Sequence, residues 1–273
     1  MIAAMSVASE PHSAQKPSPR PAAELRITAL AGIPLVQPGD NVADLIAAGL
    51  AASGLALRRG DVMVIAQKIV SKAEGRLIDL RTITPSPRAQ ALAVEVDKDA
   101  RLVELILRES TEVVRHRKDV LVVAHRSGTI LANAGIDASN VPDGNDHVLL
   151  LPEDCNRSCR EIRARLAART GVDAGVLIID SLGRAWRNGT IGTALGAAGL
   201  PALLDLRGRP DLFGRELRST QVGIADEIAA AASLLMGQAD EGTPVVLIRG
   251  LDLPRVDGSA ADLLRAREID LFR

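Results

Sequence analysis

Short runs of branched apolar residues, separated by polar turns, give this chain its pattern. Consecutive apolar side chains suit a strand that is buried on both faces, and alternation suits a strand with one exposed face. Two runs that flank Ser127-Gly128, at 120–123 and 129–131, predict a hairpin. The remaining runs predict strands over residues 25–30, 62–65, 147–151, 176–179 and 245–248.

Apolar residues at helical spacing predict the other elements. Three of these segments follow a residue whose side chain can cap a helix, namely Asp40, Ser86 before Pro87, and Asp99. A glycine at position 171 is placed to end another one. Helices are therefore predicted over residues 40–50, 87–96, 99–114, 159–169 and 226–235.

The order of these elements predicts the fold class and the domain limits. Strands and helices do not alternate regularly and no internal repeat is found, so the sequence predicts an α+β fold rather than a doubly wound sheet. Residues 1–24 are proline-rich, lack periodicity and predict a disordered tail. We expect one globular region over 25–273. Within it, residues 189–200 are rich in Gly and Ala, which lets backbone pack closely against backbone or a ligand.

Two of the buried strands lead into residues that suit a phosphate or metal site. Strand 176–179 is followed by Asp180, Ser181 and two arginines, an order typical of an aspartate that holds a divalent cation beside arginines that bind phosphate. Strand 62–65 leads into three cations and a hydroxyl within residues 68–76, which are also suited to phosphate. The alternatives are a strand that ends in a surface turn and a solvated charged loop.

A third polar cluster occupies residues 133–141. It combines small residues, the carboxylate of Asp137 and the side-chain amides of Asn133 and Asn140. Small residues permit close approach of a ligand, and amides can read a base or a ribose. An Asx-rich turn is the alternative interpretation.

Composition excludes several classes of partner. A net charge of -1 leaves no basic surface for nucleic acid, and the three aromatic residues are too few for base stacking. No apolar run is long enough to span a bilayer. Cys155 and Cys159 lack a second pair and a nearby His, so we expect reduced thiols rather than a zinc site. The sequence thus predicts a cytoplasmic protein with neither nucleic-acid nor membrane partners.

With its clusters taken in order, the chain resembles the CofE family, the coenzyme F420-0:L-glutamate ligases or F420 gamma-glutamyl ligases. The resemblance covers about residues 25–255 and implies a two-lobed α+β fold. That fold has mixed and antiparallel sheets with flanking helices, and it forms an intertwined homodimer with the nucleotide at the interface. The motifs are G-I-P-L-V at 32, S-K-A-E-G-R at 71, N-A-G-I-D-A-S-N-V at 133, D-S-L-G-R-A-W-R at 180, F-G-R-E-L at 213, A-D-E-I-A at 225 and L-L-M-G at 234.

The resemblance implies a role for each matching residue. Asp137 and Asp180 match ligands of a first metal ion, and Ser181 and Gln238 match ligands of a second. The positions that match nucleotide contacts are Ile33, Pro34, Leu35, Val36, Gln67, Lys68, Lys72, Asn140, Met236, Gly237, Gln238, Ala239, Asp240, Glu241, Gly242 and Thr243. Lys72 and Arg184 are our candidates to neutralise the remaining phosphate charge. Trp186 is a candidate contact of the deazaflavin ring, with ordinary packing as the alternative.

The chain also departs from the family pattern. Gln67-Lys68 stands where archaeal members carry small hydroxyl residues, Ser181 replaces a frequent Thr, and Leu182 replaces a frequent Asn or Met. The first departure affects nucleotide contacts, whereas Ser keeps the oxygen that Thr supplies. The N-terminal tail is additional, and the flavin-reductase-like domain of two-domain actinobacterial relatives is not expected here.

The implied reaction is a GTP-dependent amide ligation. GTP would phosphorylate the terminal carboxylate of F420-0, and the amine of L-glutamate would displace phosphate from the acyl phosphate, with GDP as the other product. Two Mn²⁺ or Mg²⁺ ions and K⁺ are the implied cofactors, and positioning and charge neutralisation dominate such chemistry. One alternative is a ligase of the same scaffold with another carboxylate acceptor. The other is a nucleotide-binding regulatory protein, which the retention of both aspartates disfavours.

Overall fold

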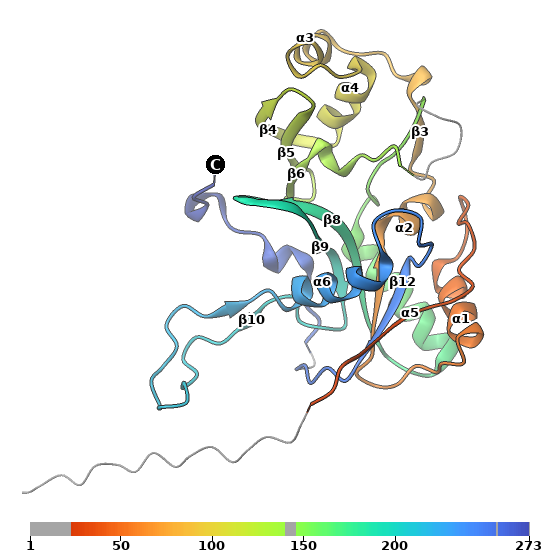
Figure 1. Cartoon of the computed structure of the whole chain (residues 1–273), viewed down its shortest axis with the longest axis vertical. Helices are drawn as coiled ribbons and strands as arrows, with labels where there is room; N and C mark the ends of the chain where they lie inside the picture. The colour runs from red at the N-terminus through yellow and green to blue at the C-terminus, as the bar shows by residue number, and fades with distance from the viewer. Residues whose placement is uncertain (1–22, 140–145, 255, 273) are drawn as a thin grey trace, which may run out of the picture.

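A mixed five-stranded sheet forms the centre of the molecule (Figure 1). The computed structural model describes residues 23–139, 146–254 and 256–272. The strand order is β1-β12-β2-β8-β9, in which β2 and β8 are parallel and the other neighbours are antiparallel. The strands are β1 (Arg26–Ala29), β12 (Val245–Arg249), β2 (Val62–Ala66), β8 (Gly175–Arg184) and β9 (Arg187–Ala198). The predicted α+β class with mixed sheets is confirmed.

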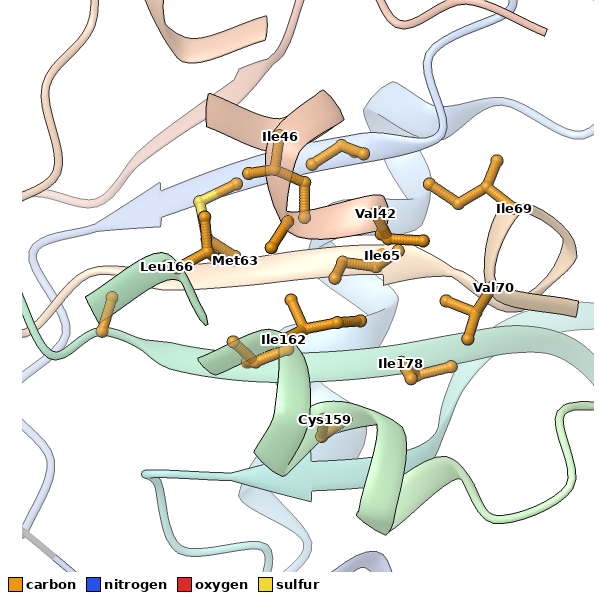
Figure 2. Close-up of a cluster of buried hydrophobic side chains, with 14 of the residues drawn as sticks. Val42, Ile46, Met63, Ile65, Ile69, Val70, Cys159, Ile162, Leu166 and Ile178 are labelled. Atoms are coloured by element: carbon orange, nitrogen blue, oxygen red, sulfur yellow. The ribbon is translucent and has the colours of Figure 1, made fainter. Parts of the chain in front are cut away.

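Helices cover both faces of this sheet, which explains its continuous apolar strands. On one face, Met63 and Ile65 of β2 pack with α1 (Val42–Ala52) and α5 (Cys155–Thr170), as Figure 2 shows. On the other face, Val62 and Val64 pack against α6 (Ile224–Met236). Each fully buried aliphatic side chain of this kind stabilises the fold by about 1.5–3 kcal/mol.

A second group of elements lies at one end of the molecule (Figure 1). It packs two helices on a three-stranded antiparallel sheet around a core of its own, which includes Val103, Ile106, Leu121 and Val123. Its elements are α3 (Pro87–Val96), α4 (Ala100–Arg108), β4 (Ser110–Arg117), β5 (Val120–His125) and β6 (Ile130–Ala132).

Short elements complete the chain. An arm that carries β10 and β11 projects from the body (Figure 1). Within the described ranges, no helix is both long and apolar enough to cross a membrane. The remaining elements are α2 (Gln67–Ala73), β3 (Leu77–Asp79), η1 (Leu80–Thr82), η2 (Asn133–Gly135), β7 (His147–Leu149), β10 (Leu204–Asp205), β11 (Gln221–Val222), η4 (Ala260–Leu263) and η5 (Arg267–Ile269).

Local signals in the sequence identify most helix ends correctly. The side chains of Ser86 and Asp99 accept hydrogen bonds from backbone N–H groups of α3 and α4, and Gly171 ends α5 in the left-handed conformation. Asp40 is not the cap of α1, because Asn41 accepts from Ala43 N while Asp40 binds the N–H of Gln37. Helix α5 begins at Cys155, directly after its cap Asp154 and four residues before the predicted start at 159.

Two predictions near the polar clusters are wrong. Strand β8 does not stop at Asp180 but continues to Arg184, because β9 pairs with it along its length. The charged segment after β2, for which a loop was the alternative interpretation, is the helix α2. The helix predicted over 99–114 ends at Arg108, and the residues from Ser110 onward form β4, which pairs with β5. In both cases, pairing with the next strand of a hairpin decides the structure.

The prediction for the Gly- and Ala-rich segment is confirmed. It lies within β9, which is covered by α5 on one face and by α6 on the other. A Cβ atom on Gly196 would lie 2.4 Å from the Cys155 carbonyl, and one on Gly192 would lie 2.4 Å from the Ala229 carbonyl oxygen. The missing side chains let helix backbone approach strand backbone. Residues 1–22 of the predicted tail lie outside the described ranges, and the two-lobed dimer stays a prediction.

Candidate active site

Four segments singled out in the sequence meet at one edge of the central sheet. Strands β1, β2 and β8 share a direction, so their carboxyl ends lie at the same edge as the start of β12. Ala66 pairs with Ile179, and its N–H donates to the Pro244 carbonyl at 2.8 Å. Leu30 N donates to the Val245 carbonyl at 2.9 Å. The segments brought together are 33–36, 67–72, 180–181 and 236–243.

A lysine from α2 ties the third polar cluster to this edge. The Nζ atom of Lys68 lies 2.6 Å from Oδ2 of Asp137 and 2.7 Å from the hydroxyl of Ser139. Ser139 N donates to Oδ1 of Asp137 at 2.6 Å, which closes an Asx-type turn. The Asx-turn interpretation is therefore confirmed, and the contact of this cluster with a ligand stays a prediction. Ser139 was not among the predicted site residues, although the spacing D-x-S was a signal for it.

The carboxylate of Asp180 belongs to the same electrostatic group. Burial raises the pKa of Asp180 to about 6; the nearby Lys68 lowers it and the nearby Asp137 raises it. For Asp137, burial also raises the pKa, but hydrogen bonds from Lys68 and Ser139 outweigh it, and its pKa is lower than usual. Two carboxylates thus share one ammonium group, and only one of them is fully neutralised by it.

This donor set fits a divalent cation. The ammonium of Lys68 occupies the position beside the Asp137 carboxylate that a metal ion would take. No ion pair of Asp180 is found among the residues that the structure describes, and its pKa is raised. The described residues contain no group of three or more His, Cys, Asp and Glu side chains that could hold a metal. Two carboxylates would therefore need hydroxyl, amide, phosphate or water oxygens to complete the shell, which is usual for Mg²⁺.

The predicted ligands of a second ion differ in exposure. Ser181 follows Asp180 in β8, so the two side chains point to opposite faces of the strand. Gln238 is exposed in the loop between α6 and β12. Gly237 begins this loop with a positive φ of 71°, and the Thr243 hydroxyl donates to the Leu235 carbonyl at 2.8 Å to anchor its end.

Two further residues of α2 differ in their surroundings. Burial and the charge of Lys68 lower the pKa of Lys72, so two lysines lie on one side of this helix. Gln67, by contrast, is buried and accepts a hydrogen bond from the Ser71 hydroxyl at 2.8 Å. Its Nε2 atom has no hydrogen-bond partner among the described residues. Its predicted contact with a nucleotide stays a prediction.

Other predicted residues are not brought to Asp180. Arg184 lies four residues further along β8, about 13 Å at the rise of a strand, and donates to the Asn188 carbonyl at the exposed hairpin end. Trp186 is 88% exposed there, with its ring centroid 6.1 Å from that of Phe272. Leu35 is exposed while Val36 is buried. Asn140 lies outside the described residues, and Cys155 and Cys159 are free thiols as predicted.

The fold and the site together define a protein suited to binding phosphate groups together with a metal ion. Two aspartates, two lysines and a Gly-containing loop gather at one edge of a mixed sheet, an arrangement suited to phosphate groups and a divalent cation.

Comparisons with known proteins give the family. The profile of the F420-0:Gamma-glutamyl ligase family matches residues 32–250. The coenzyme F420:L-glutamate ligase of Methanopyrus kandleri is 50% identical over 242 residues, which cover 87% of this chain and 93% of the relative. The enzyme of the same name from Methanothermobacter thermautotrophicus is 49% identical, with 89% and 96% covered, and that from Archaeoglobus fulgidus is 42% identical, with 89% and 94% covered. This chain belongs to the F420-0:gamma-glutamyl ligase family.

Proposed function

We propose that this protein joins L-glutamate to the coenzyme F420 precursor F420-0 in a GTP-dependent reaction that passes through an acyl phosphate and releases GDP and phosphate. The family and the names of the relatives support the ligation. The observation that supports the mechanism is that Lys68 pairs with Asp137 and also acts electrostatically on the buried Asp180, at the sheet edge where the predicted nucleotide-contact segments lie. Further gamma-linked glutamates are a possible extension of the same chemistry.

The residues of the site act mainly by position and charge. Asp137 and Asp180 would hold the first ion, and Ser181 and Gln238 would hold a second; Mn²⁺ or Mg²⁺ supplies neutralisation of phosphate charge when bound. Lys68, which pairs with Asp137 at 2.6 Å, would be available to a phosphate oxygen if a metal ion bound Asp137 instead. Lys72, whose pKa is lowered by burial and by the charge of Lys68, would bind a phosphate oxygen in its charged form. K⁺ is a further proposed cofactor.

The main alternative is a ligase of this scaffold that uses another carboxylate acceptor. A single assay separates the two. The purified chain is given GTP, Mn²⁺, L-glutamate and F420-0, and a mass gain of one glutamyl unit or more is expected. If phosphate were released only with a different carboxylic acid, that acid would be the acceptor in place of F420-0. Asp137→Ala and Asp180→Ala should each remove ligation, and full turnover by either variant would overturn the metal assignment.

We also propose that the protein works as a homodimer. The arm between β10 and β11 carries Leu212 and Phe213, which are 77% and 75% exposed in the single chain. Exposed apolar side chains on a projecting arm suit an interface between copies. Figure 1 shows how far the arm extends from the sheet.

A further inference from the structure

A second hollow lies beside the aspartate site and contains none of the residues assigned above. It is a cavity of about 490 Å³ between the β5–β6 turn, the start of α5, strand β9 and η4. A volume of this size is in the range of small-molecule sites. Its charged lining consists of Arg126, Glu153, Asp154 and Arg157.

The walls of this cavity are held in fixed positions. The Asn156 side-chain oxygen accepts hydrogen bonds from Ala197 N at 3.1 Å and from Ala260 N at 3.0 Å, so it ties α5 to β9 and to η4. Behind the cavity, the buried Glu109 receives Arg126 at 3.2 Å and Arg76 at 2.8 Å. The guanidinium of Arg126 is thus oriented by a buried carboxylate, and its side chain stays 39% exposed.

The charges that line the cavity are of both signs and interact with each other. Arg157 donates to Glu153 at 2.8 Å. This hydrogen bond and the charge of Arg157 lower the pKa of Glu153, and the more distant charges of Arg126 and Arg76 add to the effect. Cations and anions therefore face one space. A polyanion such as a nucleotide would be poorly matched by such a set, because it meets as many carboxylates as guanidinium groups.

The cavity is connected to the aspartate site through Cys155. This residue lines the cavity, and it packs in one apolar cluster with Leu195 and with Leu182. Leu182 lies two residues after Asp180 and so on the same face of β8. Burial raises the pKa of the Cys155 thiol to about 12, and the negative charge of Asp180 is close enough to contribute. Cys155 and Leu182 therefore link the cavity to the strand that carries Asp180 and the proposed metal site.

We propose that this cavity binds the incoming amino acid, with Arg126 and Arg157 receiving its carboxylates and Glu153 its ammonium group. The inference rests on the proposed function, which supplies three substrates to choose from. GTP and F420-0 carry anionic groups and no ammonium, whereas L-glutamate carries an ammonium group and two carboxylates. The mixed-sign lining selects the third.

Steady-state kinetics of the full chain test the assignment. Arg157→Gln is expected to raise the KM for L-glutamate at least tenfold at saturating GTP and F420-0, while the KM for GTP stays within twofold. Arg160→Gln is the matched control, because Arg160 is an exposed arginine of the same helix that does not line the cavity. Its kinetic constants should equal those of the parent chain. Arg126→Gln provides a second test, with thermal unfolding to show that its fold is retained.

Inhibition by glutarate tests the ammonium contact. Glutarate has both carboxylates of glutamate but no amine. Its inhibition constant against glutamate should therefore be at least tenfold higher than the KM for glutamate. Glu153→Gln should reduce this difference between the two ligands. If Arg157→Gln raised the KM for F420-0 instead of that for glutamate, the cavity would be the binding site of F420-0. If its kinetic constants were unchanged, the cavity would bind no substrate. Absence of ligation in the parent chain would instead refute the proposed function.

Discussion

At the scale of single residues, Asp137 and Asp180 have opposite electrostatic situations although they share one lysine. Burial acts on both carboxyl groups. For Asp137, the hydrogen bonds from Lys68 and Ser139 and the charge of Lys68 together outweigh burial, whereas for Asp180 burial outweighs the stabilising contacts. In the folded protein, the surroundings thus stabilise the ionised form of Asp137 and destabilise that of Asp180. A divalent cation would stabilise the ionised carboxylate of Asp180.

The raised pKa of Asp180 predicts a pH-dependent stability effect. The pKa is about 6 in the folded protein and about 3.9 in an unfolded chain, so the metal-free protein loses stability as pH rises through this interval. Asp180→Asn removes the effect. In chelator, the variant should be more stable than the parent by about 1–2 kcal/mol at pH 8, and the gain should vanish near pH 4. Urea unfolding at both pH values measures the difference.

Asp137→Asn serves as the comparison, because it should change stability in the other direction. The folded pKa of Asp137 is below its usual value, so its ionised form stabilises the fold at neutral pH and this contribution is lost in acid. The variant should be less stable than the parent at pH 7. Equal shifts of both variants in one direction would contradict the asymmetry between the two aspartates.

Metal binding should follow the same titration. A proton and a cation compete for Asp180, so affinity for Mn²⁺ should be constant above about pH 7 and fall by up to tenfold per pH unit below about pH 6. Calorimetric titration of the full chain between pH 5 and 8 gives the curve. In Asp180→Asn the residual affinity should lose this slope near pH 6. A slope retained by that variant would assign the titration to another group.

At the scale of elements, the close contact of β9 with the start of α5 sets the position of that helix. A Cβ atom on Gly196 would lie 2.4 Å from the Cys155 carbonyl, which belongs to the helix backbone and cannot rotate away. We expect Gly196→Ala to destabilise the protein by about 2–3 kcal/mol. Gly183→Ala is the control, since nothing lies within 4 Å of its added Cβ atom. Thermal unfolding compares them, and equal melting temperatures would contradict the packing argument.

Elements were predictable from the sequence where their causes are local. The caps Ser86 and Asp99 and the C-terminal Gly171 act on neighbouring backbone, so composition reveals them. The length of β8 was not predictable, because its polar half is extended by pairing with β9. The same holds for the contact of Lys68 with Asp137, since it depends on how two distant segments pack. The cavity between α5 and β9 was not predictable either, because segments far apart in the sequence line it.

At the scale of the whole molecule, the ends of the protein differ in their exposed apolar surface. The arm carries Leu212 and Phe213, and the end of the β8–β9 hairpin carries Trp186 against Phe272. The opposite end, formed by α3 and α4, exposes Val94 on a helix surface (Figure 1). A cluster of large apolar groups on a projecting arm indicates an interface, whereas a single exposed valine is ordinary.

This asymmetry predicts which variant dissociates the proposed dimer. Replacing Leu212 and Phe213 together by Asp places two charges in the interface, and the dissociation constant should rise about 30-fold or more. Sedimentation velocity over a concentration series measures it. Val94→Asp is the matched control, because it adds a charge at an equally exposed apolar position on the far end. Dissociation caused by Val94→Asp instead would move the interface to α3, and a parent chain that sediments as a monomer at every concentration would refute the dimer itself.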